Sequence, residues 1–410
     1  MINYKKPLLV SFLIINAIQF FAADPLSKNI DLYGFVRNDL YFNSRQNTEG
    51  LDGLFNMFPK SKEIDAFGGD LNDKPNSEML SVATRLGMDI KTDLKAFGAK
   101  SSAKIEFDFA GISSNYYLIR LRQAYMKLNW SDKTELLIGQ TWHPMFGNVY
   151  PNIISLNAGS PFQPFNRSPQ IRLTENLTKN FSIIAMASYQ MQYLSQGPVG
   201  ASASYMKNAL LPNIFLGLEH KTANWISGVG FDTKTIKINN DNLSSFSGVF
   251  YSQYINNSFQ AKAKILVGEN MSDHLMMGGY GISGYDISTR HTDYTNFNTL
   301  SSWINIAYGK IVQVGVFSGI SQNLGTNKTL MSSLSGYTAY GYGFSATSQS
   351  QIDGIFRIAP FVAYNISNIK LALEYELTNA TYGIIENTGR VKDPYSVTNH
   401  RALVSLCYNF

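Results

Sequence analysis

The sequence has little of several things that a chain of 410 residues normally uses. Cys407 is its one cysteine, which excludes an intrachain disulfide framework. Charged residues make up only 15%, and the mean hydropathy of −0.11 does not indicate a helical membrane protein. Beyond residue 23 no apolar run approaches the roughly 20 residues of a membrane-spanning helix. If the chain enters a membrane, it must therefore do so as a closed β-barrel, which leaves no backbone group unpaired in lipid.

The first 23 residues have the three parts of a secretory signal peptide. Lys5 and Lys6 precede the apolar segment Pro7–Ile15, and small residues follow up to Ala23. A transmembrane anchor is the alternative, but the uncharged stretch 7–23 is shorter than the roughly 20 residues that span comfortably. We therefore expect residues 1–23 to be removed on export and residues 24–410 to form a single domain.

Much of the remaining chain alternates between apolar and polar side chains, the period of a strand with two different environments. Ile105 and Phe107, for example, alternate with Lys104 and Glu106. A soluble β-sandwich also contains such runs, but it does not require apolar faces at so even a spacing along the whole chain. Sixteen strands are predicted, at 29–42, 81–91, 100–109, 117–127, 135–142, 170–174, 181–192, 213–220, 224–234, 245–254, 259–268, 300–308, 311–318, 355–364, 369–377 and 399–410.

The connections between these segments alternate in length. Segments 220–224 and 308–311 are tight, whereas 43–80, 147–169 and 380–398 are long. Short turns at one end and long loops at the other are typical of periplasmic turns and extracellular loops. The sequence therefore predicts an all-β fold, a 16-stranded antiparallel transmembrane β-barrel with long extracellular loops.

The last strand provides a second indication. Val404 and Leu406 share a face with Tyr408 and Phe410, and the chain ends on that aromatic residue. This ending is similar to the assembly signal of outer-membrane barrels, with Tyr408 and Phe410 as its aromatic residues. We expect strand 399–410 to pair with strand 29–42, because an open sheet edge in lipid is costly.

Residues 116–173 are predicted to form strand, turn, strand, long loop and strand. The loop 146–168 contains three prolines, which disfavour sheet pairing, and apolar side chains that require a surface to pack on. We therefore expect it to fold into the lumen as an inward-folded constriction loop. Its expected constriction residues are Phe146, Pro151, Pro161, Phe162, Pro164 and Phe165.

Strand alternation also brings basic residues to the lumen. Because the loop 146–168 has no Asp or Glu, we expect an eyelet that is basic on the wall and neutral on the loop. Tyr125 is expected on the opposite face from Arg120 and Arg122. Rings of Arg and Lys select anions by their field. In the alternative interpretation the arginines pair with lumen acids and only fill and rigidify the barrel. The predicted pore residues are Arg37, Arg85, Arg120, Arg122, Arg167 and Arg172.

Three motifs in this central stretch resemble a known family. They are Arg120-Leu-Arg-Gln-Ala-Tyr, Gly139-Gln-Thr-Trp and Pro161-Phe-Gln-Pro-Phe-Asn-Arg-Ser-Pro-Gln-Ile-Arg. They are similar to the core motifs of the DcaP-type porins, trimeric outer-membrane barrels of Gram-negative bacteria whose basic eyelet favours anionic solutes. The resemblance implies a homotrimer in outer-membrane lipid that passes small anionic solutes. The N-terminal coiled coil that the family often carries is not visible in this sequence.

The sequence shows no pattern typical of a cofactor, a metal ion, a nucleic acid or a catalytic reaction. Ser272, Asp273 and His274 are adjacent, and adjacent residues do not readily form a triad. An outer-membrane barrel enzyme of lipase or protease type, and a surface-binding barrel or adhesin, remain the alternatives to a porin. The histidines are scattered without metal-ligand spacing, at His143, His220, His274, His291 and His400.

Overall fold

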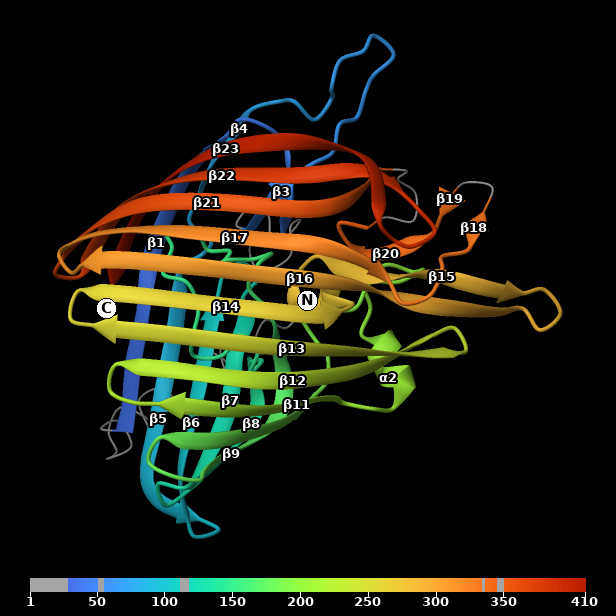
Figure 1. The fold of residues 1–410 in the computed structure, drawn as a ribbon. Coiled ribbons are helices and arrows are strands. Elements are labelled where there is room, and N and C mark those ends of the chain that lie inside the picture. The colour runs from blue at the N-terminus through green and yellow to red at the C-terminus, as the bar shows by residue number, and fades with distance from the viewer. Residues whose placement is uncertain (1–28, 51–54, 111–117, 334–335, 345–349) are drawn as a thin grey trace, which may run out of the picture.

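The computed structural model describes residues 29–50, 55–110, 118–333, 336–344 and 350–410, so the expected signal peptide lies outside the described residues. One antiparallel sheet closes on itself into a barrel (Figure 1). Its sixteen barrel strands are β1 (Ile30–Asn43), β5 (Arg85–Ala96), β6 (Ala99–Asp108), β7 (Arg120–Trp130), β8 (Thr134–Trp142), β9 (Arg167–Asn176), β10 (Phe181–Ser188), β11 (Asn213–Lys221), β12 (Trp225–Ile238), β13 (Asp241–Asn256), β14 (Phe259–Glu269), β16 (His291–Gly309), β17 (Val312–Thr326), β21 (Ser350–Ile366), β22 (Ile369–Ile385) and β23 (Val391–Asn409).

Shorter elements belong to the connections between these strands. Three of them extend the barrel sheet: β4 (Asn76–Leu80), β15 (Gly278–Asp286) and β20 (Ala339–Tyr342). The others are β2 (Asn47–Gly50), β3 (Phe55–Pro59), β18 (Ser332–Ser333), β19 (Gly336–Tyr337), α2 (Ser204–Ala209) and the 3₁₀ turn η2 (Met271–His274). Within the described part of the chain, no helix has the length and apolarity needed to cross a membrane.

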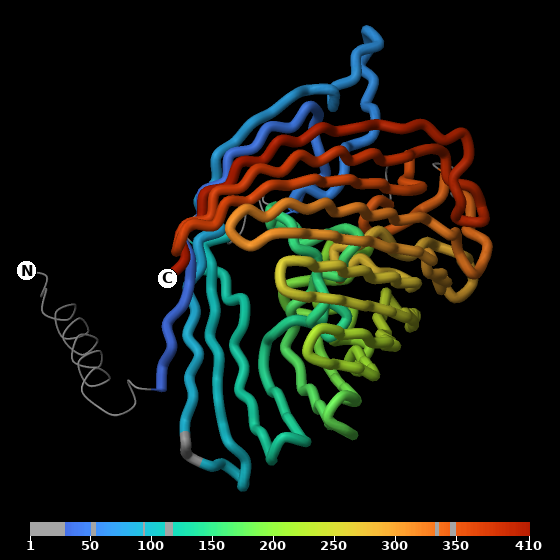
Figure 2. Tube along the Cα trace, turned by 60° about the vertical axis from the view of Figure 1, so that its left-hand side comes forward, coloured from blue at the N-terminus to red at the C-terminus, as the bar shows by residue number. Residues whose placement is uncertain are grey.

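The first and last strands close the barrel. β1 pairs with β23 from Phe35 opposite Asn409 to Asn43 opposite Arg401. Its other edge pairs with β5, where Phe35 lies opposite Arg85. Figure 2 shows the blue N-terminal strand beside the red C-terminal one. The predicted number of strands and the predicted closing pair are both confirmed.

The side-chain alternation divides a lipid-facing surface from the lumen. In β22, Leu371, Leu373 and Tyr375 are exposed on the outside, whereas Ala372 and Glu374 between them are buried inside. Exposed aliphatic side chains cost little in lipid, which is as apolar as they are. Apolar side chains on the outer face therefore alternate with polar ones on the inner face, and the chain as a whole is not rich in apolar residues.

Short turns lie at one end of the barrel and longer segments, including α2 and β15, lie at the other (Figure 1). The predicted alternation is confirmed, with one correction. Residues 380–398, expected as a long loop, form a strand hairpin in which Thr381 lies opposite Ser396 and only 386–390 connect the strands. The side chains of this hairpin do not alternate as those of a lipid-facing strand do, so the sequence did not indicate a strand. Backbone hydrogen bonds extend the ladder here without that alternation.

A β-bulge in β7 corrects another prediction. Leu121 lies opposite Phe107 and Gln123 opposite Glu106, so Arg122 is an additional residue in the strand. An extra residue reverses the side-chain parity that follows it. Tyr125 therefore faces the lumen, opposite Lys104, and not the lipid side expected from strict alternation.

We predict that Phe410→Ala impairs barrel assembly. The Phe410 backbone exchanges two hydrogen bonds of 3.1 Å with Gly34, and its ring covers that glycine. Since the side chain is half-exposed, its loss should lower the free energy of unfolding by about 2 kcal/mol. The folded fraction can be measured as heat-modifiable protein on cold SDS gels after expression.

Phe356→Ala is the matched control, because Phe356 is also a partly exposed phenylalanine but lies in β21, away from the closing pair. It should cost similar stability while leaving the yield of assembled barrel unchanged. Equal yields for the two variants would show that Phe410 has no special role in assembly.

Candidate pore constriction

The loop between β8 and β9 folds into the lumen, as predicted. Val149, Ile154 and Phe162 are almost completely buried. Phe162 packs against Phe317 of β17, on the opposite side of the barrel from β8, with 5.9 Å between ring centroids. The three prolines and the remaining predicted loop residues are also buried, at Phe146, Pro151, Pro161, Pro164 and Phe165.

Cationic side chains from the barrel wall hold the carbonyl groups of this loop. The Lys264 ammonium of β14 donates to the carbonyl oxygens of Met145 and Phe146, both at 2.8 Å. Arg37 of β1 donates to the Ile154 oxygen at 2.6 Å. Because the loop has no sheet partner, these side chains replace the strand that would otherwise pair its backbone.

A carboxylate holds the amide groups of the same loop. Glu374 of β22 accepts hydrogen bonds from the backbone N–H of Ile154 at 2.7 Å and of Ser155 at 3.0 Å. The amide oxygen of Asn305 likewise accepts from the N–H of Asn152 at 2.8 Å. The sequence analysis assigned neither Glu374 nor Lys264 to the anchoring of this loop.

A second segment also enters the lumen, and the sequence analysis missed it. Hairpin β2–β3 brings Phe55 against Phe165, with ring centroids 4.7 Å apart. Arg357 donates to the carbonyl oxygen of Met57 at 2.6 Å and to that of Ser160 at 2.9 Å, so it ties the hairpin to the constriction loop. The sequence feature that could have indicated this hairpin is the mostly apolar segment 55–59 within an otherwise polar loop.

The wall facing the constriction loop carries arginines and carboxylates in contact. Arg120 binds Asp108 through two hydrogen bonds of 2.9 and 2.6 Å. Arg122 donates to Glu106 at 2.7 Å and to Asp108 at 2.9 Å. Arg85 lies 3.9 Å from Glu106. The predicted arginines therefore come together, but they pair with the acids that the alternative interpretation proposed.

A cavity of about 400 Å³ lies between this wall and the loop. One side is charged, and the other is aromatic or apolar. Trp142 stacks on Phe146 with ring centroids 3.9 Å apart, which fixes part of the aromatic side. The lining residues are Phe55, Ala83, Arg85, Glu106, Asp108, Arg120, Arg122, Gln123, Trp142, Phe146, Gly147, Asn148, Tyr150, Leu156, Ala158 and Phe165.

A wider cavity of about 850 Å³ lies at the short-turn end. Asn148 lines both cavities, so the two adjoin at this residue. Arg172 belongs to the wider cavity and not to the constriction. The charged residues of the wider cavity are basic Lys95, Lys100, Lys127, Lys133, Arg172 and Lys221, against acidic Asp132, Glu135 and Glu219.

Two further arginines that were predicted to line the pore lie outside both cavities. Arg37 contacts Asp39 at 2.9 Å and anchors the loop. Arg167 is completely buried, with its guanidinium 4.6 Å from the Trp142 ring and a 2.7 Å hydrogen bond to the Tyr193 hydroxyl. Neither lines the narrow cavity, so Arg85, Arg120 and Arg122 form the basic side of the constriction.

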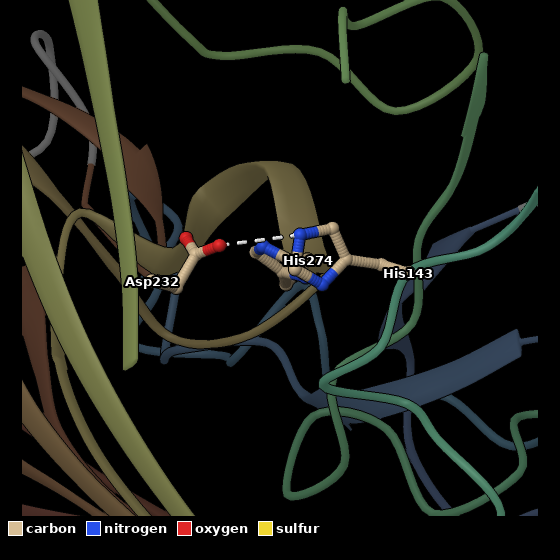
Figure 3. A group of neighbouring side chains, drawn as sticks. All are labelled: His143, Asp232 and His274. Atoms are coloured by element: carbon tan, nitrogen blue, oxygen red, sulfur yellow. Dashed lines mark ion pairs between the residues drawn. The ribbon is translucent and has the colours of Figure 1, made fainter. Parts of the chain in front are cut away.

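A buried cluster that the scattered histidines did not predict lies near the start of the constriction loop. His143, Asp232 and His274 approach one another (Figure 3), with 3.3 Å between His143 Nε2 and an Asp232 oxygen. Burial lowers the pKa of His274 to about 4. Burial also raises the pKa of Asp273, but the neighbouring Lys234 charge outweighs this, and the pKa lies below its usual value.

The adjacent Ser272, Asp273 and His274 do not form a hydrolase arrangement. The Ser272 hydroxyl donates to the amide oxygen of Asn270 at 3.1 Å. Asp273 contacts Lys234 and accepts from Gln190 at 2.9 Å. The serine and the aspartate are thus each bound to partners outside the triplet.

We predict that Gly319→Ala displaces the constriction loop. A Cβ at Gly319 in β17 would lie 2.6 Å from the buried Phe162 ring, so the ring or the strand must move. Such overpacking should lower the free energy of unfolding by about 1–3 kcal/mol. The loss can be measured as a lower unfolding temperature of the barrel in detergent.

Gly248→Ala is the control, because a Cβ at that lipid-facing glycine would make only an ordinary contact of 4.0 Å with the Gly230 carbonyl oxygen. Its free energy of unfolding should be unchanged or higher by up to about 1 kcal/mol. Equal free energies of unfolding for the two variants would contradict the proposed contact between Gly319 and the loop.

Comparisons with known proteins identify structural neighbours of this barrel but no relative in sequence. No protein-family model and no curated protein matches the sequence. The structure is similar to the outer membrane channel DcaP of Acinetobacter baumannii, with a TM-score of 0.67 and 18% identity over 93% of this chain and 97% of that chain.

Two other solved structures extend the comparison. An anion-selective porin from Comamonas acidovorans has a TM-score of 0.55 and 10% identity over 93% of this chain and 99% of that one. OmpF of Salmonella typhi has a TM-score of 0.52 and 12% identity over 93% and 98%. The chain therefore has the fold of the outer-membrane porins, and its expected resemblance to the DcaP-type porins is confirmed at the level of the fold.

Proposed function

We propose that the protein is an outer-membrane porin through which small hydrophilic solutes diffuse, with a preference for anions. The observation that carries this proposal is the charge balance of the narrow cavity. Three arginines, Arg85, Arg120 and Arg122, face only two carboxylates, Glu106 and Asp108. One positive charge is left over in the cavity between the barrel wall and the constriction loop.

The hydrogen bonds of the wall support a surplus of donors. Each carboxylate oxygen of Glu106 and Asp108 already accepts from Arg120, Arg122 or Tyr33. Among the described residues, Arg85 Nε and Arg120 Nη1 have no hydrogen-bond acceptor. Both atoms are buried, so these groups act on a passing anion through their charge, whose field is stronger beside a weakly polar wall than in bulk water.

The surrounding charges act in the same direction. Buried Arg167 lies behind the wall and has no carboxylate partner among the described residues. The wider cavity at the short-turn end has six basic residues against three acidic ones. A solute that crosses the constriction would therefore remain in a positive field.

Assembly and location form part of the same proposal. OmpT of Vibrio cholerae, a structural neighbour with a TM-score of 0.53, is described in a trimer form. We propose a homotrimer of this chain in outer-membrane lipid, exported by residues 1–23 and folded as a single domain from residue 24. The exposed apolar outer face of strands such as β22 supports contact with lipid.

We predict that Arg120→Gln combined with Arg122→Gln shifts the reversal potential in a salt gradient towards cation selectivity. The described cavity charge changes from +1 to −1, that is, from three arginines and two carboxylates to one and two. The shift should be largest at 0.1 M salt, where screening extends over about 10 Å, and small at 1 M, where it extends over about 3 Å.

A quadruple variant that adds Glu106→Gln and Asp108→Asn is the matched control. It restores the cavity charge to +1 and should recover the anion preference. An unchanged reversal potential in the double variant at low salt would assign the arginines to filling and rigidifying the barrel. Wild-type protein without conductance would instead favour a surface-binding barrel closed by its inward segments.

A further inference from the structure

We propose that His143, Asp232 and His274 form a binding site for a divalent transition metal of the Zn²⁺ class. His143 directly follows β8 at the start of the constriction loop, Asp232 lies on β12 and His274 belongs to η2. A metal ion held here would join the constriction loop, the barrel wall and the turn η2 at one point (Figure 3).

The donor atoms are already assembled and buried. One ligand atom from each of the three side chains lies within 4.8 Å of the other two. The residues are only 2%, 4% and 2% exposed, in the order His143, Asp232 and His274. The 3.3 Å between His143 Nε2 and an Asp232 oxygen matches two ligands of one tetrahedral ion with bonds of roughly 2 Å.

One polar atom on each of two of these side chains lacks a hydrogen-bond partner, although Asp232 Oδ2 accepts from the Asn213 amide at 2.9 Å. Within the described part of the chain, Asp232 Oδ1 and His274 Nδ1 accept no hydrogen bond, and Asp232 Oδ1 is the oxygen that lies 3.3 Å from His143 Nε2. Unpaired buried acceptors are costly and call for an explanation. Metal coordination would satisfy lone pairs on both residues.

The local charge also favours a cation. Asp232 and Asp273 are buried together near Lys234, which contacts Asp273. With both imidazoles neutral, these groups sum to −1, and the remaining negative charge belongs to Asp232. Two imidazoles and one carboxylate suit Zn²⁺, Co²⁺, Ni²⁺ or Cu²⁺ and are a poor set for Ca²⁺ or Mg²⁺, which prefer oxygen ligands.

Metal binding would change the hydrogen bonds of His143. Its Nδ1 accepts from the N–H of Met145 at 3.2 Å, and its Nε2 lies 2.9 Å from the amide oxygen of Asn213. A neutral imidazole that coordinates a metal through Nε2 carries its proton on Nδ1, where it faces the Met145 N–H. Binding must therefore shift the turn at 143–147, which is the beginning of the constriction loop.

The test uses the full-length mature barrel without a histidine tag, refolded in detergent micelles and treated with a chelator. Co²⁺ is titrated while its visible absorption is recorded, and Zn²⁺ binding is measured by calorimetry and by the rise in the unfolding temperature. We expect one saturable metal ion per chain. His274→Gln and Asp232→Asn should each weaken binding by at least about tenfold.

His291→Gln is the control, because His291 belongs to a half-exposed group with Asp241 and Asp293 that offers the other described set of ligands. Its metal binding should equal that of the wild type. Loss of binding in His291→Gln with retention in His274→Gln would overturn the proposal. If both site variants fail to fold, the titration of the wild type decides. A wild-type barrel that shows no saturable visible absorption on addition of Co²⁺ would contradict the site.

Discussion

Backbone hydrogen bonding is the constraint on which the rest of this structure depends. An N–H or C=O group that is unpaired in lipid costs several kcal/mol, so β1 must pair with β23 and close the sheet. The same requirement applies inside the barrel, where the constriction loop is buried but has no strand beside it. Lys264, Arg37 and Glu374 take the place of that strand by pairing the carbonyl and amide groups of the loop. Closure and constriction are therefore two solutions to one problem.

This constraint gives many lumen charges a structural task. Arg357 holds both the β2–β3 hairpin and the constriction loop, and Arg37 anchors the loop while it pairs with Asp39. A count of lumen-facing arginines consequently overstates the field that a passing solute meets. Under the proposed function, selectivity would depend on the surplus of arginines over carboxylates in the cavity between the wall and the loop.

Strand alternation predicted the number of strands and the closing pair, because lipid on one side and water on the other impose a period of two on every spanning strand. The prolines and apolar side chains of residues 146–168 predicted the inward loop. It could not predict the bulge at Arg122, since one inserted residue changes parity without any change in composition. The β2–β3 hairpin and the approach of His143 to Asp232 and His274 depend on contacts between distant segments. Such contacts carry no signal in local periodicity.

The pairing of the wall arginines also bears on how an anion would pass. Asp108 binds Arg120 through two hydrogen bonds and Arg122 through one, which fixes both guanidinium groups without solute. Fixed donors require no reorganisation when an anion arrives, but their partners reduce the net field. In the proposed porin, a small surplus charge on a rigid wall would attract anions without holding them tightly. Weak, salt-sensitive attraction is what diffusion through a pore requires, because a solute that bound strongly would not leave.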